Sequence, residues 1–120
     1  MICTLQRHAK IIIKVGSGMS GTVISAAGYI EIGSKVICGT NLTTTDTNWH
    51  HVKRSQENKG PLQPAPVIIG SNVLLGLNIL VLKGVTIGDN TVIAAISVVT
   101  KDIPRNVIAA GQPAKFVKYL

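Results

Sequence analysis

Few side chains in this sequence suit acid–base chemistry, and two of them are adjacent histidines. His50 and His51 end the stretch TDTNWHH, which begins at residue 45. A neutral imidazole, with an ordinary pKa of about 6.5, can take a proton from a hydroxyl group at physiological pH. Asp46 and Asn48 precede His50 by four and two residues, so either could orient its ring or contact a substrate. On these residues alone, the simpler interpretation of His50 is an ordinary loop histidine.

The other candidate side chains are weaker. Neighbours in an extended chain point to opposite sides, so His50 and His51 are not both expected to face one substrate. His8 lies outside the repeat described below and is expected on the surface. Two cysteines are too few for a disulfide framework. Cys38 occupies a repeat position expected to point inward, which favours a small buried side chain over a nucleophile or metal ligand.

The elements that must position these residues follow from a repeat of six. An aliphatic residue recurs at every sixth position over Ile69, Leu75, Val81, Ile87, Ile93 and Val99. A helix would scatter these residues over three faces, whereas a strand keeps residues six apart on one face. Gly, Asn and Asp between them are turn residues. Short strands and turns repeated at fixed length predict a β-solenoid.

A weaker repeat extends upstream. Ile32, Cys38 and Thr44 keep the register, while Ile13, Met19 and Ser25 are offset by one residue, which predicts a bulge near residues 27–30. A second inward position is expected four residues after each first one, at Val23, Val36, Leu42, Val73, Ile79, Val85, Thr91 and Ser97.

Two segments break the period. Residues 46–66 are polar, carry three prolines and the only Trp, and are predicted to form an excursion loop. Loops of this length in compact domains are often functional. The period ends after Val99, and residues 103–120 are predicted to be a short C-terminal cap, which a solenoid needs over its open end.

Composition limits the class of protein. The 120 residues predict one domain, 1–120, with a core of Ile, Val and Leu because aromatic residues make up only 3%. A net charge of +7 favours an anionic partner. Nucleic acid is disfavoured because the cations are scattered without aromatic side chains among them. The N-terminus lacks the apolar region of a signal peptide and no apolar run is long enough for a membrane span, so a cytoplasmic setting is expected.

Three stretches together resemble the hexapeptide-repeat acyltransferases, in particular bacterial capsule and lipopolysaccharide sugar O-acetyltransferases. They are GMSGTVISA at 18–26, TDTNWH at 45–50, and the run from APVIIG to GQPAK at 65–115. The resemblance implies a single-stranded left-handed parallel β-helix with three hexads per coil, so that residues 69–86 and 87–104 each form one coil. It also implies a homotrimer with active sites between subunits, and acetyl-coenzyme A as donor.

The resemblance also implies roles for individual residues. His50 aligns with the catalytic histidine and is predicted to be the general base for direct attack on the thioester by a hydroxyl of a sugar or similar small acceptor. Asp46, Asn48 and Trp49 are predicted to orient it or bind the acceptor. Asn48 stands where many relatives carry Asp, so no charged histidine–carboxylate pair is expected there. The predicted coenzyme-binding residues are Leu77, Ala95, Thr100, Lys101, Lys115 and Lys118.

Three alternatives remain open. Leu77, where relatives usually carry Ala or Ser, favours a non-catalytic solenoid that acts as a scaffold or partner subunit. A serine acetyltransferase-like enzyme would share the fold and donor. A γ-carbonic-anhydrase-like zinc enzyme is less favoured because its paired histidine spacing is absent, and no metal is predicted. The sequence does not identify the acceptor.

Overall fold

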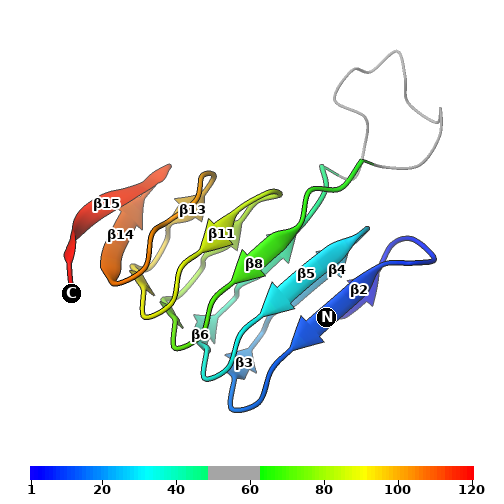
Figure 1. Ribbon diagram of the computed structural model, residues 1–120, viewed down its shortest axis with the longest axis horizontal. Helices are drawn as coiled ribbons and strands as arrows, with labels where there is room; N and C mark the ends of the chain where they lie inside the picture. Colours follow the sequence, from blue (N-terminus) through cyan, green and yellow to red (C-terminus); the bar gives the residue numbers. More distant parts are fainter. Residues whose placement is uncertain (49–62) are drawn as a thin grey trace.

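The computed structural model describes residues 1–48 and 63–120, which form an all-β parallel solenoid of about five turns (Figure 1). The described residues contain no helix, and therefore none that could cross a membrane. The chain visits three sheets in turn on each coil. Sheet A contains β1 (Ile2–Thr4), β4 (Val23–Ala26), β7 (Thr43–Thr45), β10 (Leu80–Val81) and β13 (Val98–Val99). Sheet B contains β2 (Lys10–Ile13), β5 (Tyr29–Ile32), β8 (Val67–Ile69) and β11 (Thr86–Ile87). Sheet C contains β3 (Gly18–Ser20), β6 (Ile37–Thr40), β9 (Leu74–Leu75), β12 (Val92–Ile93), β14 (Val107–Gly111) and β15 (Ala114–Tyr119).

The predicted six-residue period is confirmed as the inward face of the solenoid. All six aliphatic residues that define it have 0% exposure. Parallel pairing joins Ile69 to Ile87, Leu75 to Ile93 and Val81 to Val99, each eighteen residues apart. The second inward set is also buried, from Val36 and Leu42 through Ser97, with Val23 as the exception. Cys38 lies in this core, as predicted.

The predicted register of the second coil is wrong by one residue. Ile24, not Ser25, pairs with Thr44 and points inward, and Thr22 takes the buried position predicted for Val23. The cause is a register shift between β3 and β6 beside Gly18 and Ser20, upstream of the predicted bulge. A sequence pattern cannot locate such a shift because both registers place a small or apolar residue inside.

The last coil is shorter than expected. Ile87 pairs with Ile103, sixteen residues on, so the predicted coil 87–104 is two residues too long. Residues 100–102 make a tight corner in which the Asp102 carboxylate accepts a hydrogen bond from the Thr86 N–H at 2.8 Å. The core continues past Val99 through Ile103, Val107 and Ala109. Only β15 departs from the solenoid, because it pairs antiparallel with β14.

The three edges of the prism differ in regularity. The B–C edge, where the chain passes from sheet B to sheet C, repeats the same turn in successive coils, with Lys35, Asn72, Asn90 and Asn106 at positive φ. The A–B edge varies in length on every coil, through residues 5–9, 27–28, 46–66, 82–85 and 100–102. Insertions are tolerated at an edge because the sheets on either side stay in register.

Candidate active site on the A–B edge

The longest departure on the A–B edge separates β7 from β8, and both of its ends are well placed. Asp46 is fully buried, with 0% exposure. Its Oδ1 accepts a hydrogen bond from Ala27 N–H at 2.7 Å, and its Oδ2 accepts from Gly28 and Tyr29 N–H at 2.8 and 2.7 Å. Backbone donors thus take the place of a cation around this carboxylate, and bonds to a charged acceptor are stronger than neutral ones. We call this set, Asp46 with residues 27–29, the Asp46 bridge.

The other end of the excursion is held against the same place. The Ala65 N–H donates to the carbonyl oxygen of Asp46 at 2.8 Å, and the Ala65 carbonyl accepts from Gly84 N–H at 3.0 Å. A Cβ built on Gly28 would lie 2.8 Å from Pro64 Cγ, so a glycine is needed for this approach. The two ends of the excursion therefore leave the prism at one fixed point.

The predicted catalytic group falls partly within the described residues. Trp49, His50 and His51 lie outside them. Asn48 is exposed at the end of the described stretch, and Asp46 lies beneath it in the bridge. Both oxygens of Asp46 already accept hydrogen bonds from backbone N–H groups. The carboxylate therefore holds the chain in place where the excursion begins. The partners of Asp46 could not be predicted from the sequence, because backbone donors leave no side-chain pattern.

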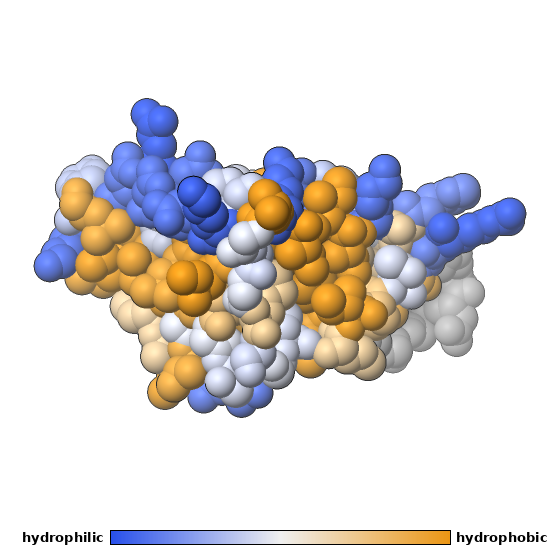
Figure 2. Space-filling model, turned by 90° about the horizontal axis from the view of Figure 1, so that it is seen from below, coloured by the Kyte–Doolittle hydropathy of each residue, from blue (hydrophilic) through white to orange (hydrophobic). Residues whose placement is uncertain are grey.

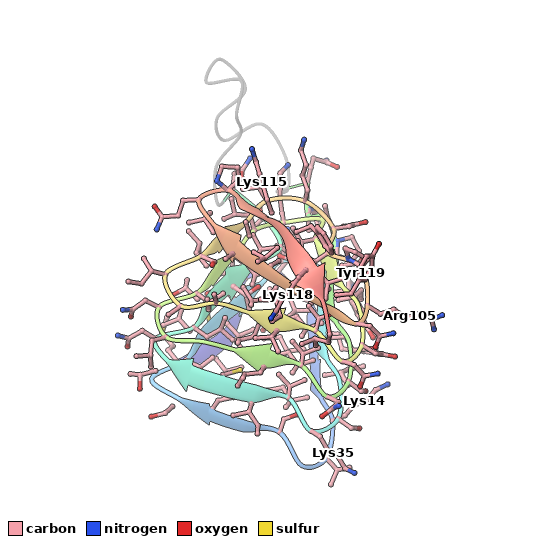
Figure 3. The ribbon with its side chains drawn as sticks, turned by 90° about the vertical axis from the view of Figure 1, so that its left-hand side faces the viewer. Lys14, Lys35, Arg105, Lys115, Lys118 and Tyr119 are labelled. Carbon is pink, nitrogen blue, oxygen red and sulfur yellow. The ribbon has the colours of Figure 1, made fainter. Side chains whose placement is uncertain are left out.

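The predicted coenzyme-binding residues lie in three places. Leu77 and Ala95 stack on the C–A edge, where Ile96 N–H donates to the Leu77 carbonyl at 2.8 Å. Thr100 and Lys101 are exposed on the A–B edge. Lys115 and Lys118 project from β15 at the C-terminal end of the prism (Figure 3). Sheet A separates the first two groups.

Leu77 leans away from Ala95. Its side chain is 53% exposed, and its Cδ2 lies 3.0 Å from the position of a Cβ on Gly39, in the preceding coil. Leu77 thus fills the space that Gly39 leaves free. Ala95 is exposed. The bulky Leu77, which departs from the family pattern, does not cover it.

Sheets A and C present surfaces without charge. No strand of sheet A, and no strand of sheet C before β15, contains a charged residue. Seen from below, apolar side chains cover much of the solenoid beneath a row of polar ones (Figure 2). The exposed apolar residues of sheet C and of the C–A edge include Ile37, Leu74, Leu77 and Ile96. Large uncovered apolar surfaces often mark contact sites.

A cavity that the sequence did not predict opens on sheet B. It has a volume of about 570 Å³ and is lined by residues that include Ile68, Thr86, Asp89, Asp102 and Arg105. It forms because the last coil is two residues short, so that sheet B ends at β11 while sheets A and C continue. Asp89 and Asp102 each accept a backbone hydrogen bond at its rim, from Ser71 and Thr86.

Comparison with known proteins places this geometry in a family. Residues 66–101 match the family model described as the hexapeptide repeat of succinyl-transferase. Galactoside O-acetyltransferase of Escherichia coli K12 is 43% identical over 89 residues, covering 74% of this chain and 43% of that protein. The crystal structure of a polysialic acid O-acetyltransferase superposes with a TM-score of 0.81 at 32% identity, covering 91% of this chain and 53% of that one. Galactoside acetyltransferase in complex with coenzyme A gives a TM-score of 0.77 at 31% identity, covering 98% of this chain and 64% of that one.

The chain belongs to the hexapeptide-repeat acetyltransferases. It covers less than half the length of the Escherichia coli relative, so it matches only part of that enzyme.

A cysteine nucleophile finds little support in the part of the chain that the structure describes. Burial raises the pKa of the Cys38 thiol to about 11, which keeps it protonated at neutral pH and unsuited to nucleophilic attack. No group of three His, Cys, Asp or Glu among residues 1–48 and 63–120 could hold a metal ion.

Proposed function

We propose that this chain transfers an acetyl group from acetyl-coenzyme A to a hydroxyl of a sugar. The observation that carries the proposal is the Asp46 bridge, because it fixes the backbone four residues before His50 on the edge that also exposes Thr100 and Lys101. Four residues span at most about 14 Å, which is the reach from the bridge that the proposal requires of His50.

In the proposed reaction His50 acts as the general base. Its neutral imidazole takes the proton of the acceptor hydroxyl while that oxygen attacks the thioester carbonyl carbon. The tetrahedral intermediate collapses, the C–S bond breaks, and the sulfur of coenzyme A leaves as the thiol with the proton returned by the imidazolium. Backbone N–H groups of the groove would stabilise the developing oxyanion. Asn48 and Trp49 would contact the acceptor beside His50.

Acetyl-coenzyme A is a substrate with several negative charges and a long flexible arm. Lys101, Lys115 and Lys118 are exposed, and no ion pair joins them to a carboxylate of the described residues. They would meet its phosphates or adenine, while Thr100 and the small, uncovered Ala95 leave backbone accessible to the arm. Leu77 would border this path from the C–A edge.

The chain is proposed to form a homotrimer with active sites between subunits. The uncharged surfaces of sheets A and C meet at the C–A edge, where Leu77 and Ile96 are exposed. A subunit that places sheet A against sheet C of the next makes a head-to-tail contact, which closes into a ring when each step turns by a third of a circle. Light scattering would measure the mass of the particle and so the number of subunits. A monomer would rule out an active site between subunits.

A non-catalytic solenoid is the second candidate, favoured by Leu77. One experiment separates the two. Purified chain is incubated with acetyl-coenzyme A and a panel of acceptors made up of sugars and serine. The thiol released is then measured. Acceptor-dependent release supports the enzyme. If no thiol is released and calorimetry detects no binding of coenzyme A at millimolar concentration, the non-catalytic solenoid is the interpretation that remains.

A further inference from the structure

A group of cations lies on the A–B edge on the far side of the excursion from the predicted coenzyme residues. A turn from Gln6 to Ala9, closed by Ala9 N–H donating to the Gln6 carbonyl at 3.1 Å, places Arg7 and His8 at its tip. Arg7, His8 and Lys10 are all exposed. We call Arg7 and Lys10 the N-terminal cation pair.

Backbone hydrogen bonds tie this turn to the candidate site. Leu5 N–H donates to the Ala26 carbonyl at 2.7 Å, and Lys10 N–H donates to the Gly28 carbonyl at 2.9 Å. Gly28 in turn donates its own N–H to Asp46 Oδ2. Lys10 and Asp46 are therefore both hydrogen-bonded to Gly28. They lie on strands two spacings apart, so about 10 Å separates them along the edge.

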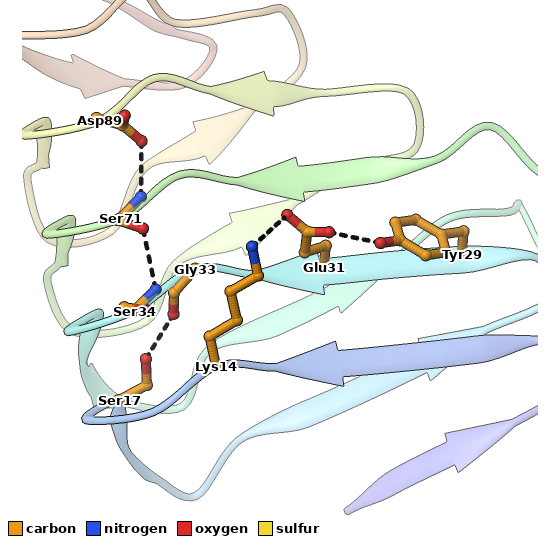
Figure 4. Close-up of polar contacts among 8 residues, drawn as sticks. All are labelled: Lys14, Ser17, Tyr29, Glu31, Gly33, Ser34, Ser71 and Asp89. Atoms are coloured by element: carbon orange, nitrogen blue, oxygen red, sulfur yellow. Dashed lines mark hydrogen bonds and ion pairs between the residues drawn. The ribbon is translucent and has the colours of Figure 1, made fainter.

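Within residues 1–48 and 63–120, no acidic side chain neutralises the charge of the pair. The one ion pair among the described residues joins Lys14 to Glu31 at 3.6 Å. Tyr29 also donates its hydroxyl hydrogen to Glu31, so this carboxylate, the acid on the adjacent strand β5, is already engaged (Figure 4). Asp46 is fully buried and bonded to three amides. No carboxylate of the described residues forms an ion pair with Arg7 or Lys10.

The coenzyme does not account for these charges. Its proposed phosphate contacts are Lys101 in the last coil and Lys115 and Lys118 beyond it. Arg7 lies in the first coil, four strand spacings or about 19 Å from the last, with the excursion between them. A second anionic group, other than those of the coenzyme, would account for the positive charge at this end of the edge.

We infer that the acceptor is an anionic saccharide whose carboxylate or phosphate binds Arg7 and Lys10. The guanidinium of Arg7 offers paired donors that match either group, and Lys10 adds a second positive charge on the same edge. This inference rests on the proposed function, since it names the acceptor of that site. It also predicts that the acceptor binds on the N-terminal side of the Asp46 bridge while the donor binds on its C-terminal side.

The test compares galactose, galacturonic acid and galactose 6-phosphate, which share the hydroxyl groups at C1 to C4. Both anionic sugars carry their charge in place of the free 6-hydroxyl of galactose. Initial rates are measured for the natural chain and for the double variant Arg7→Gln/Lys10→Gln. The matched control is Lys35→Gln/Arg105→Gln, which removes one lysine and one arginine from the B–C edge (Figure 3). The acid and the phosphate separate the two sources of negative charge.

We expect one or both anionic sugars to be preferred, and Arg7→Gln/Lys10→Gln to raise their KM roughly tenfold or more. The KM for galactose and for acetyl-coenzyme A should not change, and the control should retain the natural values. Equal losses in both double variants, or no preference for the anionic sugars, would overturn the inference. Titration of galacturonic acid and galactose 6-phosphate into chain without donor, followed by NMR, tests binding separately. If thiol release is absent for every acceptor but this binding depends on Arg7 and Lys10, the proposed function fails and the anion site stands.

Discussion

The A–B and B–C edges of the same prism show two ways of using one repeat. The B–C edge stacks equivalent turns that are linked by hydrogen bonds (Figure 4). The Ser17 hydroxyl donates to the Gly33 carbonyl at 2.8 Å, Ser34 N–H donates to Ser71 Oγ at 3.1 Å, and Ser71 N–H donates to Asp89 Oδ1 at 2.8 Å. The A–B edge changes length on every coil, and its largest excursion is held by a single buried carboxylate. One edge therefore provides the regular stacking that holds coils in register, and the other is free to carry residues for chemistry.

The largest effect expected from this division falls on His50. His50→Ala should lower kcat at least about a hundredfold, because a positioned general base contributes that much or more to proton transfer. His51→Ala is the matched control, being the same change one residue away, and should keep most of the activity. Thiol release with a saturating acceptor measures both. Full activity in His50→Ala would show that the A–B edge does not supply the base.

The Asp46 bridge should matter more to stability than any carboxylate on the B–C edge. Asp46→Ala leaves three amide donors without their acceptor, and we expect it to lower the free energy of unfolding by roughly 3 kcal/mol. Asp89→Ala removes one exposed hydrogen bond, to Ser71 N–H, and should cost much less. Urea unfolding measures the difference.

Activity extends the same comparison. In the fraction that remains folded, Asp46→Ala should lower kcat because the loop end is released, while the affinity for coenzyme A, whose proposed contacts lie elsewhere, stays near its natural value. Asp89→Ala should leave both unchanged. If Asp46→Ala and Asp89→Ala cost the same stability, the bridge is no more than an ordinary turn contact.

The division between edges also explains what the sequence could predict. The core from Ile69 to Val99 followed from spacing alone, because every corner in that stretch restores the six-residue step. The prediction was wrong about the register at Ile24 and about the coil length at Ile103. At both places a corner gains or loses residues, and either register still buries an aliphatic or small side chain. Asp46 was singled out beside His50, but its three partners are backbone amides of another coil, which no side-chain pattern reveals.

The smallest expected effect concerns the C–A edge, which follows the regular plan until its last coil. Asn41 and Asn78 occupy the left-handed position there, at φ of 67° and 55°, and Asn41 Nδ2 donates to Asn78 Oδ1 at 3.0 Å. In the next coil the same position holds Ile96, at φ of 60°, beside the exposed Ala95. A β-branched residue in this region is strained, whereas Asn tolerates it.

Ile96→Asn should therefore stabilise the chain by about 1 kcal/mol, because it relieves the backbone and offers Asn78 a further partner. Asn78→Ile is the reciprocal control, which introduces the same strain one coil earlier and should destabilise the chain by a similar amount or more. Urea midpoints compare the two. A loss of stability in Ile96→Asn would mean that packing of the exposed isoleucine, as in a contact with another subunit, outweighs the strain. Measurement at protein concentrations above and below the dissociation of any oligomer distinguishes these cases, because a subunit contact would make the sign of the change depend on concentration.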